Sequence, residues 1–255
     1  MSAAEPAARP DYSAYRAPLS QVYDLVYLGR GKDFVGEAKL VADLVRTRRP
    51  GASSLLDVGC GTGEHLLTWR TMFTHVEGVD VSPDMLAVAR AKLPGVPIHL
   101  GDMRDFDLGH TVDGICTLFS TLAYMPSTAD LDAAVANLAR HLTIGGVLVA
   151  EPWWFPERFL SGHIGHDVVR EDGATVARVV RTTTVEGTAH LEAHYVVADR
   201  EGIRGFVHVQ RFTLFDHADY RDAFQRAGCD VEYIPGPSTL ATGTGRGLFV
   251  GVRRR

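Results

Sequence analysis

The stretch Leu55-Leu56-Asp57-Val58-Gly59-Cys60-Gly61-Thr62-Gly63 is an apolar run that leads into a glycine-rich turn directly before Glu64. This pattern predicts a buried strand, a tight turn and the start of a helix. Because glycine has no Cβ atom, alternating glycines let a ligand approach the backbone closely. Such a turn lies at the carboxyl edge of a doubly wound sheet, where nucleotide-like ligands bind. A turn that only connects a strand to a helix, without any ligand, is the alternative.

The segment from residue 33 to residue 151 alternates short apolar runs with amphipathic stretches, which is typical of a parallel sheet with crossover helices. We expect strands at 54–58, 75–80, 98–101, 114–117 and 147–151. We expect helices at 33–48, 64–70, 83–92 and 129–141, with Ser82 and either Ser127 or Thr128 as N-caps.

After Pro152 the pattern changes to strands that only turns separate, at 168–171, 175–184, 189–197 and 204–214. Such a meander requires antiparallel pairing, and its turn signals are Asp172-Gly173, Glu186-Gly187 and Glu201-Gly202. A helix at 216–227 and strands at 229–233 and 248–253 then return to the main sheet. The predicted fold is α/β, a doubly wound, mostly parallel seven-stranded sheet with an inserted antiparallel β-sheet. We expect three parts: a core at 1–155 with an N-terminal helical segment, an accessory sheet at 156–214 and a C-terminal return at 215–255.

The composition narrows the class of protein. Hydrophobic residues make up 45% of the 255 residues and the formal net charge is -5, which is typical of folded globular proteins. A mildly acidic chain lacks the concentrated Lys and Arg with which proteins bind nucleic acids, so we expect no nucleic-acid partner. Three widely spaced cysteines favour neither disulfides nor a zinc site and fit a reduced cytoplasm. Because residues 1–10 lack signal-peptide features and no apolar run reaches the roughly 18 residues of a membrane span, we expect a cytoplasmic protein. We expect no metal site, since His190 and His194 lie four apart in a predicted strand, not on one helical turn.

Two classes of ligand fit a glycine-rich turn of this kind. Dinucleotide-binding enzymes need a glycine where this chain has Glu64, and a carboxylate there would repel a pyrophosphate. S-adenosylmethionine has no phosphate and carries an ammonium and a sulfonium, so an acid-bearing loop suits it. Asp80, after the second strand, can accept both ribose hydroxyls, while Asp102 can take the adenine amino group and Met103 can pack against the ring. Taken singly, Asp80 could instead be a helix-capping acid and Asp102 a turn residue.

Asp57 to Gly63, Val79-Asp80-Val81-Ser82 and Gly101-Asp102-Met103 resemble the class I S-adenosylmethionine-dependent methyltransferase superfamily. Over about residues 12 to 252, the chain also resembles the dTDP-amino-sugar N,N-dimethyltransferases of the desosamine and mycaminose branches of macrolide biosynthesis. The blocks that carry this narrower resemblance are Tyr23-Asp24-Leu25-Val26-Tyr27, Gly29-Arg30-Gly31-Lys32-Asp33, Gly101-Asp102-Met103-Arg104-Asp105-Phe106, Glu151-Pro152-Trp153-Trp154-Phe155-Pro156-Glu157 and Gly245-Arg246-Gly247-Leu248-Phe249.

The resemblance implies that S-adenosylmethionine is the cofactor and that the substrate is a dTDP-linked deoxyamino sugar, N,N-dimethylated for antibiotic biosynthesis. The cofactor contacts that we expect are Tyr23, Asp57, Gly59, Gly61, Gly63, Asp80, Val81, Asp102, Met103 and Phe119. For the substrate we expect contacts from Ser120, from Trp153 and Trp154 along the base and sugar, and from Arg178 and Arg246 to the pyrophosphate. The alternative is that the tryptophans are core aromatics and that the arginines are solvated.

Two tyrosines are the candidate catalytic residues. Tyr12 matches a tyrosine near the N-terminus that lies over the sugar in this family, and we expect it to orient the substrate. Tyr124 stands in a segment where other members have His or Tyr, and it is a candidate for orienting the amine or relaying its proton. Because a phenol with a pKa of about 10 is a weak base at neutral pH, we expect alignment of the reactants to dominate catalysis.

Two other functions stay open at this point. One is O- or N-methylation of another small metabolite, and the other is binding of S-adenosylmethionine without catalysis. We expect a possible homodimer only by analogy with the family.

Overall fold

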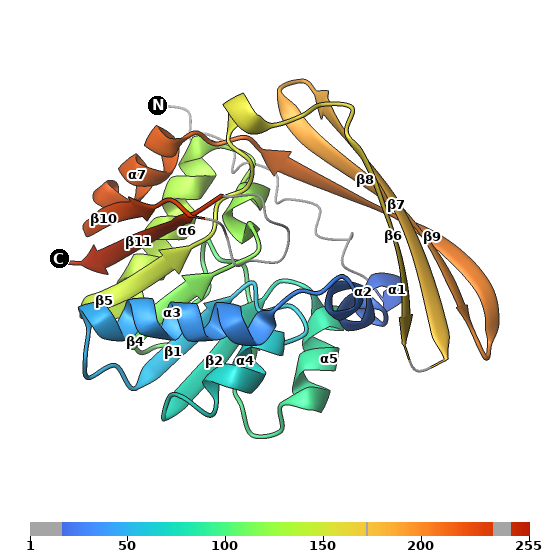
Figure 1. Cartoon of the computed structure of the whole chain (residues 1–255). Helices are drawn as coiled ribbons and strands as arrows, with labels where there is room; N and C mark the ends of the chain where they lie inside the picture. Colours follow the sequence, from blue (N-terminus) through green and yellow to red (C-terminus); the bar gives the residue numbers. More distant parts are fainter. Residues whose placement is uncertain (1–16, 172, 237–245) are drawn as a thin grey trace, which may run out of the picture.

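The computed structural model describes residues 17–171, 173–236 and 246–255, which form two β-sheets with helices around the larger one (Figure 1). The larger sheet has the strand order β10-β11-β5-β4-β1-β2-β3. Strands β1 to β5 pair in parallel, whereas β11 pairs antiparallel with both β5 and β10. The strands are β1 (Ser54–Val58), β2 (His75–Asp80), β3 (Ile98–Leu100), β4 (Val112–Thr117), β5 (Leu142–Ala150), β10 (Cys229–Ile234) and β11 (Leu248–Arg253).

Helices cover both faces of this sheet, which explains why its central strands are apolar in continuous runs. Leu55 and Leu56 are adjacent in β1 and point to opposite faces, and both are fully buried. Leu55 packs with the helices α3 (Phe34–Arg48), α4 (Glu64–Trp69) and α5 (Pro83–Lys92). Leu56 packs with α6 (Thr128–Arg140) and α7 (His217–Arg226).

Side-chain caps fix where several helices begin. The Ser82 hydroxyl accepts the Met85 N–H at the start of α5, where Pro83 takes the first helical position. Ser127, not Thr128, caps α6 by accepting the Asp130 N–H. Asp216 caps α7 in a capping box that the Asp219 side chain completes.

The second sheet is a four-stranded antiparallel meander with the order β6-β7-β8-β9, inserted between β5 and α7. Its strands are β6 (Ile164–Glu171), β7 (Ala174–Val185), β8 (Thr188–Asp199) and β9 (Gly202–Thr213). The apolar face of this accessory sheet packs on two short N-terminal helices, α1 (Ala17–Ser20) and α2 (Tyr23–Gly29), and on the 3-10 helix η2 (Thr121–Tyr124). A further 3-10 helix, η3 (Pro156–Arg158), lies between β5 and β6. The predicted fold class is confirmed, and the division at residues 155 and 214 stays a prediction.

Two strands, β5 and β6, begin five and four residues before the predicted positions 147 and 168. β5 starts at Leu142, which pairs with Val112 of β4, although residues 143–146 interrupt the apolar run. β6 starts at Ile164, which pairs with Arg181 of β7 although its own side chain is exposed. Within the described residues, no helix is long and apolar enough to cross a membrane.

Candidate active site

The glycine turn between β1 and α4 leaves open space at one position and fills it at another. Gly61 has a φ of +54°, and a Cβ atom there would meet no protein atom within 4 Å. Gly63, the N-cap of α4, has a φ of +81°, and a Cβ atom there would lie 2.6 Å from the Leu93 side chain. Gly61 therefore exposes its backbone to a cavity, whereas Gly63 serves the packing of α4 against α5.

Asp80 holds the glycine turn in place from the end of β2. One carboxylate oxygen accepts the Gly61 N–H at 2.8 Å, and the other accepts the Ser82 N–H at 2.8 Å. Burial raises the pKa of Asp80, and the backbone hydrogen bonds act in the opposite direction. Each oxygen keeps lone-pair capacity for a ligand, because a carboxylate can accept more than one hydrogen bond per oxygen.

A mostly apolar hollow of about 710 Å³ of empty space, which we call the inner cavity, opens beside this turn. It lies at the carboxyl ends of β1 and β2, as expected for a ligand site in a doubly wound sheet. Its lining consists of Tyr23, Val58, Gly59, Gly61, Val79, Asp80, Val81, Met85, Gly101, Met103, Phe119, Thr121 and Tyr124.

Asp57 faces a smaller pocket on the other side of the glycine turn, which Gly59 and Gly61 also line. Its side chain is 2% exposed, and its Oδ1 atom accepts the Cys116 thiol at 3.5 Å. Its Oδ2 atom is buried without a hydrogen-bond partner among the described residues. Burial raises the pKa of Asp57 to about 6, because an apolar setting disfavours the charged form. A cationic ligand group at Oδ2 would relieve this cost.

A strained turn separates the inner cavity from the accessory sheet. Phe119 and Ser120 have φ values of +55° and +65°, which are costly for residues other than glycine. The fully buried Glu151, directly after β5, accepts the Phe119 N–H at 2.6 Å. Ser120 donates its hydroxyl to the Pro152 carbonyl oxygen at 3.1 Å and accepts Arg246 Nη1 at 2.7 Å. Glu151 and Arg246 therefore hold the turn that carries Phe119.

A larger hollow, the outer cavity, lies between this turn and the accessory sheet and spans about 1330 Å³ of empty space that opens to solvent. Phe119 and Tyr124 line both the inner and the outer cavity, so the two cavities meet at these side chains. The Tyr124 hydroxyl accepts a hydrogen bond from the Gln210 amide. The lining consists of Tyr27, Arg30, Phe119, Tyr124, Trp153, Trp154, Arg158, Phe159, Leu160, His163, Arg178, Val180, Thr182, Leu191, Gln210, Phe212 and Arg246.

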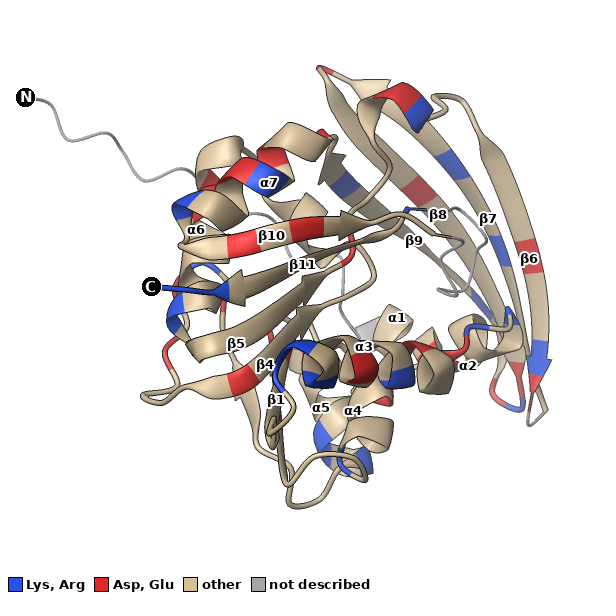
Figure 2. Cartoon of the chain, turned by 60° about the vertical axis from the view of Figure 1, so that its left-hand side comes forward, with Lys and Arg blue, Asp and Glu red and all other residues tan. Residues whose placement is uncertain are grey.

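Four arginines make the outer cavity cationic, and its described lining includes no carboxylate. Figure 2 shows basic positions directly after α2 and along the accessory sheet, which bound this space. Arg30 and Arg178 share a single acid, Asp167, at 3.1 Å each. Arg246 lies 3.1 Å from Glu151, and Arg158 is exposed at the rim. Because two guanidinium groups share one carboxylate, the cavity keeps positive charge for an anionic ligand.

Trp153 and Trp154 form one wall of the outer cavity and are half-buried, and Trp153 also packs on the core beneath the accessory sheet. Phe155 is buried in the core against the larger sheet. Trp153 stacks on Phe212 with ring centroids 4.5 Å apart. The Arg246 guanidinium lies 5.2 Å from the Trp153 ring centre and 5.8 Å from that of Trp154. The Trp153 Nε1 atom is buried and has no hydrogen-bond partner within the described part of the chain.

Comparisons with known proteins agree with this geometry. Residues 55–146 match the family model described as a methyltransferase domain. The chain is 50% identical over 239 residues to the dTDP-3-amino-3,4,6-trideoxy-alpha-D-glucopyranose N,N-dimethyltransferase of Streptomyces venezuelae, covering 93% of this chain and 99% of that protein. It is 42% identical over 241 residues to the dTDP-4-amino-2,3,4,6-tetradeoxy-D-glucose N,N-dimethyltransferase of Saccharopolyspora spinosa, covering 94% and 95% respectively. The chain belongs to the dTDP-amino-sugar N,N-dimethyltransferase family.

A solved structure agrees on the fold and the cofactor. CalS10 from Micromonospora echinaspora, an amino pentose methyltransferase of calicheamicin biosynthesis solved with bound S-adenosylmethionine, is 51% identical to this chain. It has a TM-score of 0.82 and covers 91% of this chain and 97% of its own. The cofactor of this methyltransferase is S-adenosylmethionine, and the site fits it. The open side of Gly61 admits a ligand, and the orphaned Asp57 Oδ2 atom suits the ammonium group.

Most of the residues predicted for this dimethyltransferase line one of the three hollows. The inner cavity contains Tyr23, Gly59, Gly61, Asp80, Val81, Met103, Phe119 and Tyr124, and Asp57 lies in the pocket beside it. The outer cavity contains Trp153, Trp154, Arg178 and Arg246. Tyr12 lies outside the described residues, so its role stays a prediction.

Three predicted residues have other contacts. Asp102 is absent from the inner-cavity lining, because Arg104 binds its carboxylate with Nε at 3.1 Å and Nη2 at 2.8 Å. Ser120 is buried and engages Pro152 and Arg246 rather than lining the outer cavity. Gly63 packs against α5 instead of facing a cavity.

The charged residues that the sequence analysis does not assign to the site include Glu151, Arg30 and Arg158. Glu151 carries a signal of its own, because an acid at the buried end of a strand needs a partner for its charge. Arg30 and Arg158 line the outer cavity, and they come from the residue after α2 and from η3, far apart in the sequence.

Proposed function

We propose that this enzyme transfers methyl groups from S-adenosylmethionine to the amino group of a dTDP-linked deoxyamino sugar, twice, in antibiotic sugar biosynthesis. The observation that carries the proposal is the junction of two unlike cavities at Phe119 and Tyr124. One is apolar and built around the glycine turn, and the other carries arginines and tryptophans. The names of the two dimethyltransferase relatives support the same substrate class.

The inner cavity is proposed to hold the adenosine and the pocket beside it the methionine part. Asp80 takes the ribose hydroxyls, Val81 and Met103 pack on the adenine, and Asp57 pairs with the ammonium group. Tyr23 lines both hollows and stands where the two parts join. When bound, the cofactor supplies an electrophilic methyl group on a sulfonium. Aimed at the junction, this group would meet the amine between Phe119 and Tyr124.

The outer cavity is proposed to hold the dTDP-sugar. Arg30 and Arg178 share one acid and so retain positive charge for the pyrophosphate. Arg246 lines the same cavity as a further partner for the pyrophosphate, and Arg158 adds charge at the rim. The fork of an arginine matches phosphate oxygens in a bidentate manner. Trp153 and Trp154 give the base or the sugar a flat apolar wall, and the unpartnered Trp153 Nε1 atom offers a hydrogen bond.

Catalysis in this arrangement depends mainly on alignment. The side chains of the junction hold the amine lone pair in line with the methyl group and exclude water, which removes the entropic cost of the encounter. The Tyr124 hydroxyl already accepts a hydrogen bond from Gln210, so its own proton is directed elsewhere, and its oxygen orients the amine. The predicted contribution of Tyr12 would add to this positioning.

The test is an incubation of the enzyme with labelled S-adenosylmethionine and matched dTDP-3-amino and dTDP-4-amino deoxysugars. Mass spectrometry resolves unmethylated, monomethylated and dimethylated products. We expect stepwise formation of the dimethylated product from one of the amino sugars and none from a control with a hydroxyl in place of the amine. Label transfer to the hydroxyl sugar, or to no sugar of the panel, would contradict the proposal.

We also propose that the enzyme works in the cytoplasm, since its three cysteines, Cys60, Cys116 and Cys229, are all unpaired and buried. The homodimer that analogy with the family suggests stays a prediction.

A further inference from the structure

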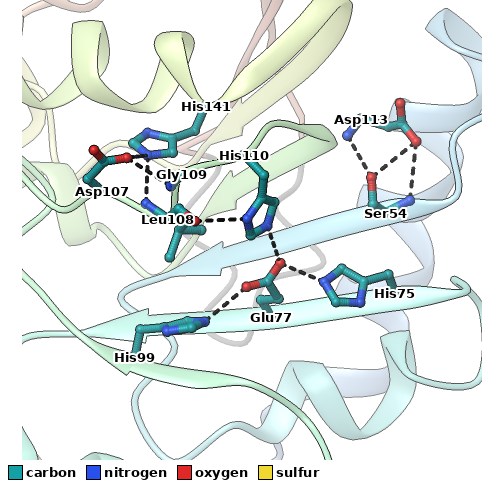
Figure 3. Close-up of polar contacts among 10 residues, drawn as sticks. All are labelled: Ser54, His75, Glu77, His99, Asp107, Leu108, Gly109, His110, Asp113 and His141. Carbon is teal, nitrogen blue, oxygen red and sulfur yellow. Dashed lines mark hydrogen bonds and ion pairs between the residues drawn. The ribbon is translucent and has the colours of Figure 1, made fainter.

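A buried glutamate on β2 contacts three histidines, and this cluster lies outside the methyl-transfer site (Figure 3). Glu77 is 2% exposed, and its Oε1 atom lies 2.6 Å from His75 Nε2 and 2.7 Å from His110 Nε2. Its Oε2 atom lies 2.9 Å from His99 Nε2. The imidazoles come from the start of β2, from β3 and from the segment before β4.

The cluster is separate from the inner cavity. Glu77 precedes Asp80 by three residues, so their Cα atoms are about 10 Å apart along the strand. Gly78 faces α4, where a Cβ atom would meet Leu66, and the alternation of β2 therefore turns Glu77 to the opposite face of the sheet. Neither Glu77 nor any of the three histidines lines the inner or the outer cavity.

The donor atoms are close enough to share one cation. One ligand atom each from His75, Glu77 and His110 lies within 4.8 Å of the others. Ligand atoms of a tetrahedral zinc site with bonds of about 2.0 Å are about 3.3 Å apart, so small rotations of the imidazoles suffice. The His75 and His110 side chains are 49% and 45% exposed, so their solvent-facing edges leave room for such rotations.

Two neighbouring contacts orient the donors. His110 Nδ1 lies 2.9 Å from the Leu108 carbonyl oxygen, which can only accept, so this nitrogen carries the N–H and donates the hydrogen bond. The Nε2 atom of His110, which points toward Glu77, is therefore the atom that can bind a metal. Metal-binding histidines are usually fixed in this way, by a hydrogen bond from the other ring nitrogen. Leu108 is itself anchored, because its N–H donates to His141 Nε2 at 3.2 Å. His99 holds the second oxygen of Glu77.

Contrary to the expectation from the sequence, we propose that His75, Glu77 and His110 form a binding site for a first-row divalent cation, with zinc as the expected occupant and water completing its coordination. Imidazole and carboxylate are the ligand types that zinc takes in three-ligand protein sites. The site would tie β2 to the segment before β4, so bound zinc stabilises the fold and takes no part in methyl transfer.

The test is calorimetric titration of the metal-free, full-length protein with zinc chloride in a non-coordinating buffer. We expect one zinc per chain, and at least about a hundredfold weaker binding in the His75→Gln/His110→Gln variant. His99→Gln should weaken binding only about tenfold, as for a residue that orients a ligand. The matched control is His194→Gln, which removes an exposed histidine that also lies beside an acid, Glu192, and should leave zinc binding unchanged.

A second measurement reports the ligands directly. Co²⁺ in a site with imidazole and carboxylate ligands gives visible absorption bands, which we expect in the wild type and in His194→Gln but not in the double variant. Binding of S-adenosylhomocysteine with unchanged affinity shows that each variant is folded. If the wild type binds no stoichiometric zinc, or if the double variant binds it as tightly as the wild type, the proposal is wrong.

Discussion

The inner and the outer cavity are built in different ways. The inner cavity is made largely of backbone and of side chains from four successive strand ends, so its shape is a property of the sheet itself. The outer cavity is assembled from α2, η3, the accessory sheet and the segment before β11. The cofactor site therefore depends on local backbone geometry, whereas the substrate site depends on how the accessory sheet packs on the core. A substitution in one cavity should therefore weaken binding of one ligand much more than binding of the other.

The largest effect is expected at the inner cavity, from Gly61→Val. A valine fills the open space beside the turn, so S-adenosylmethionine binding should weaken by about a hundredfold or more in calorimetry. The matched control is Gly187→Val in the turn between β7 and β8, which has a φ of +78° and equally open space. Both variants bear a similar backbone strain, so equal cofactor affinity in the two would contradict the assignment of the turn.

The next effect belongs to the outer cavity. Arg246→Ala should raise the KM for the nucleotide sugar by roughly a hundredfold and the KM for S-adenosylmethionine much less, because a buried charged partner is lost. It should also lower the melting temperature, since Glu151 is left as an unpaired buried acid.

A double variant distinguishes these two consequences. Arg246→Met/Glu151→Gln removes both charges, so it should regain most of the melting temperature while the KM for the sugar stays high. If the double variant also regains the KM of the wild type, Arg246 serves the fold alone and the pyrophosphate has other partners.

At the junction of the cavities, Tyr124→Phe should lower kcat by roughly tenfold to a hundredfold, less than the upper range for loss of a general base. The fold should survive, because the ring keeps its contact with Phe212. The pH profile of kcat should keep its ascending limb, which the substrate amine sets. A ten-thousandfold loss with a displaced limb would identify a dedicated base and overturn the positional account.

The smallest effect concerns the pH dependence of cofactor binding. The pKa of Asp57 is raised by burial from 3.8 to about 6, so unfolding releases its proton and the free energy of unfolding falls as the pH rises from about 4 to 6. A bound ammonium group favours the carboxylate, so affinity for S-adenosylhomocysteine should rise up to about tenfold per pH unit below 6 and level off above it. Asp57→Asn should bind more weakly and with a flat profile. If the affinity of the wild type did not change between pH 5 and 6, the proposed contact between Asp57 and the ammonium group would be wrong.

The sequence predicts the inner cavity better than the outer cavity. The run from Asp57 to Gly63 predicts a strand, a turn and a cavity, because apolar residues, glycines and the helix start are neighbours in the chain. The bounds of β1 and β2 agree with the prediction for the same reason. Asp102 is absent from the lining of the inner cavity, and its carboxylate binds Arg104, two residues away. The order of the motifs does not indicate this contact.

The remaining features are set by contacts between distant segments. Ser120 points inward because Glu151 and Arg246 fix a strained turn, and no local pattern indicates a positive φ at two residues other than glycine. Arg30 and Arg178 share Asp167 only once α2 packs on the accessory sheet. Likewise, His75 and Glu77 lie two residues apart in β2 and so share one face of the strand. His110 is distant in the sequence, and the fold brings it to the same place.

The most direct test of the central claim is a crystal structure of the enzyme with S-adenosylhomocysteine and a dTDP-linked amino sugar bound together. We predict that S-adenosylhomocysteine fills the inner cavity with its ammonium group against Asp57. The pyrophosphate should lie within hydrogen-bond distance of Arg30 or Arg178, and the sugar amine should lie between Phe119 and Tyr124. A sugar bound outside the outer cavity, or an amine away from the junction of the two cavities, would contradict the account.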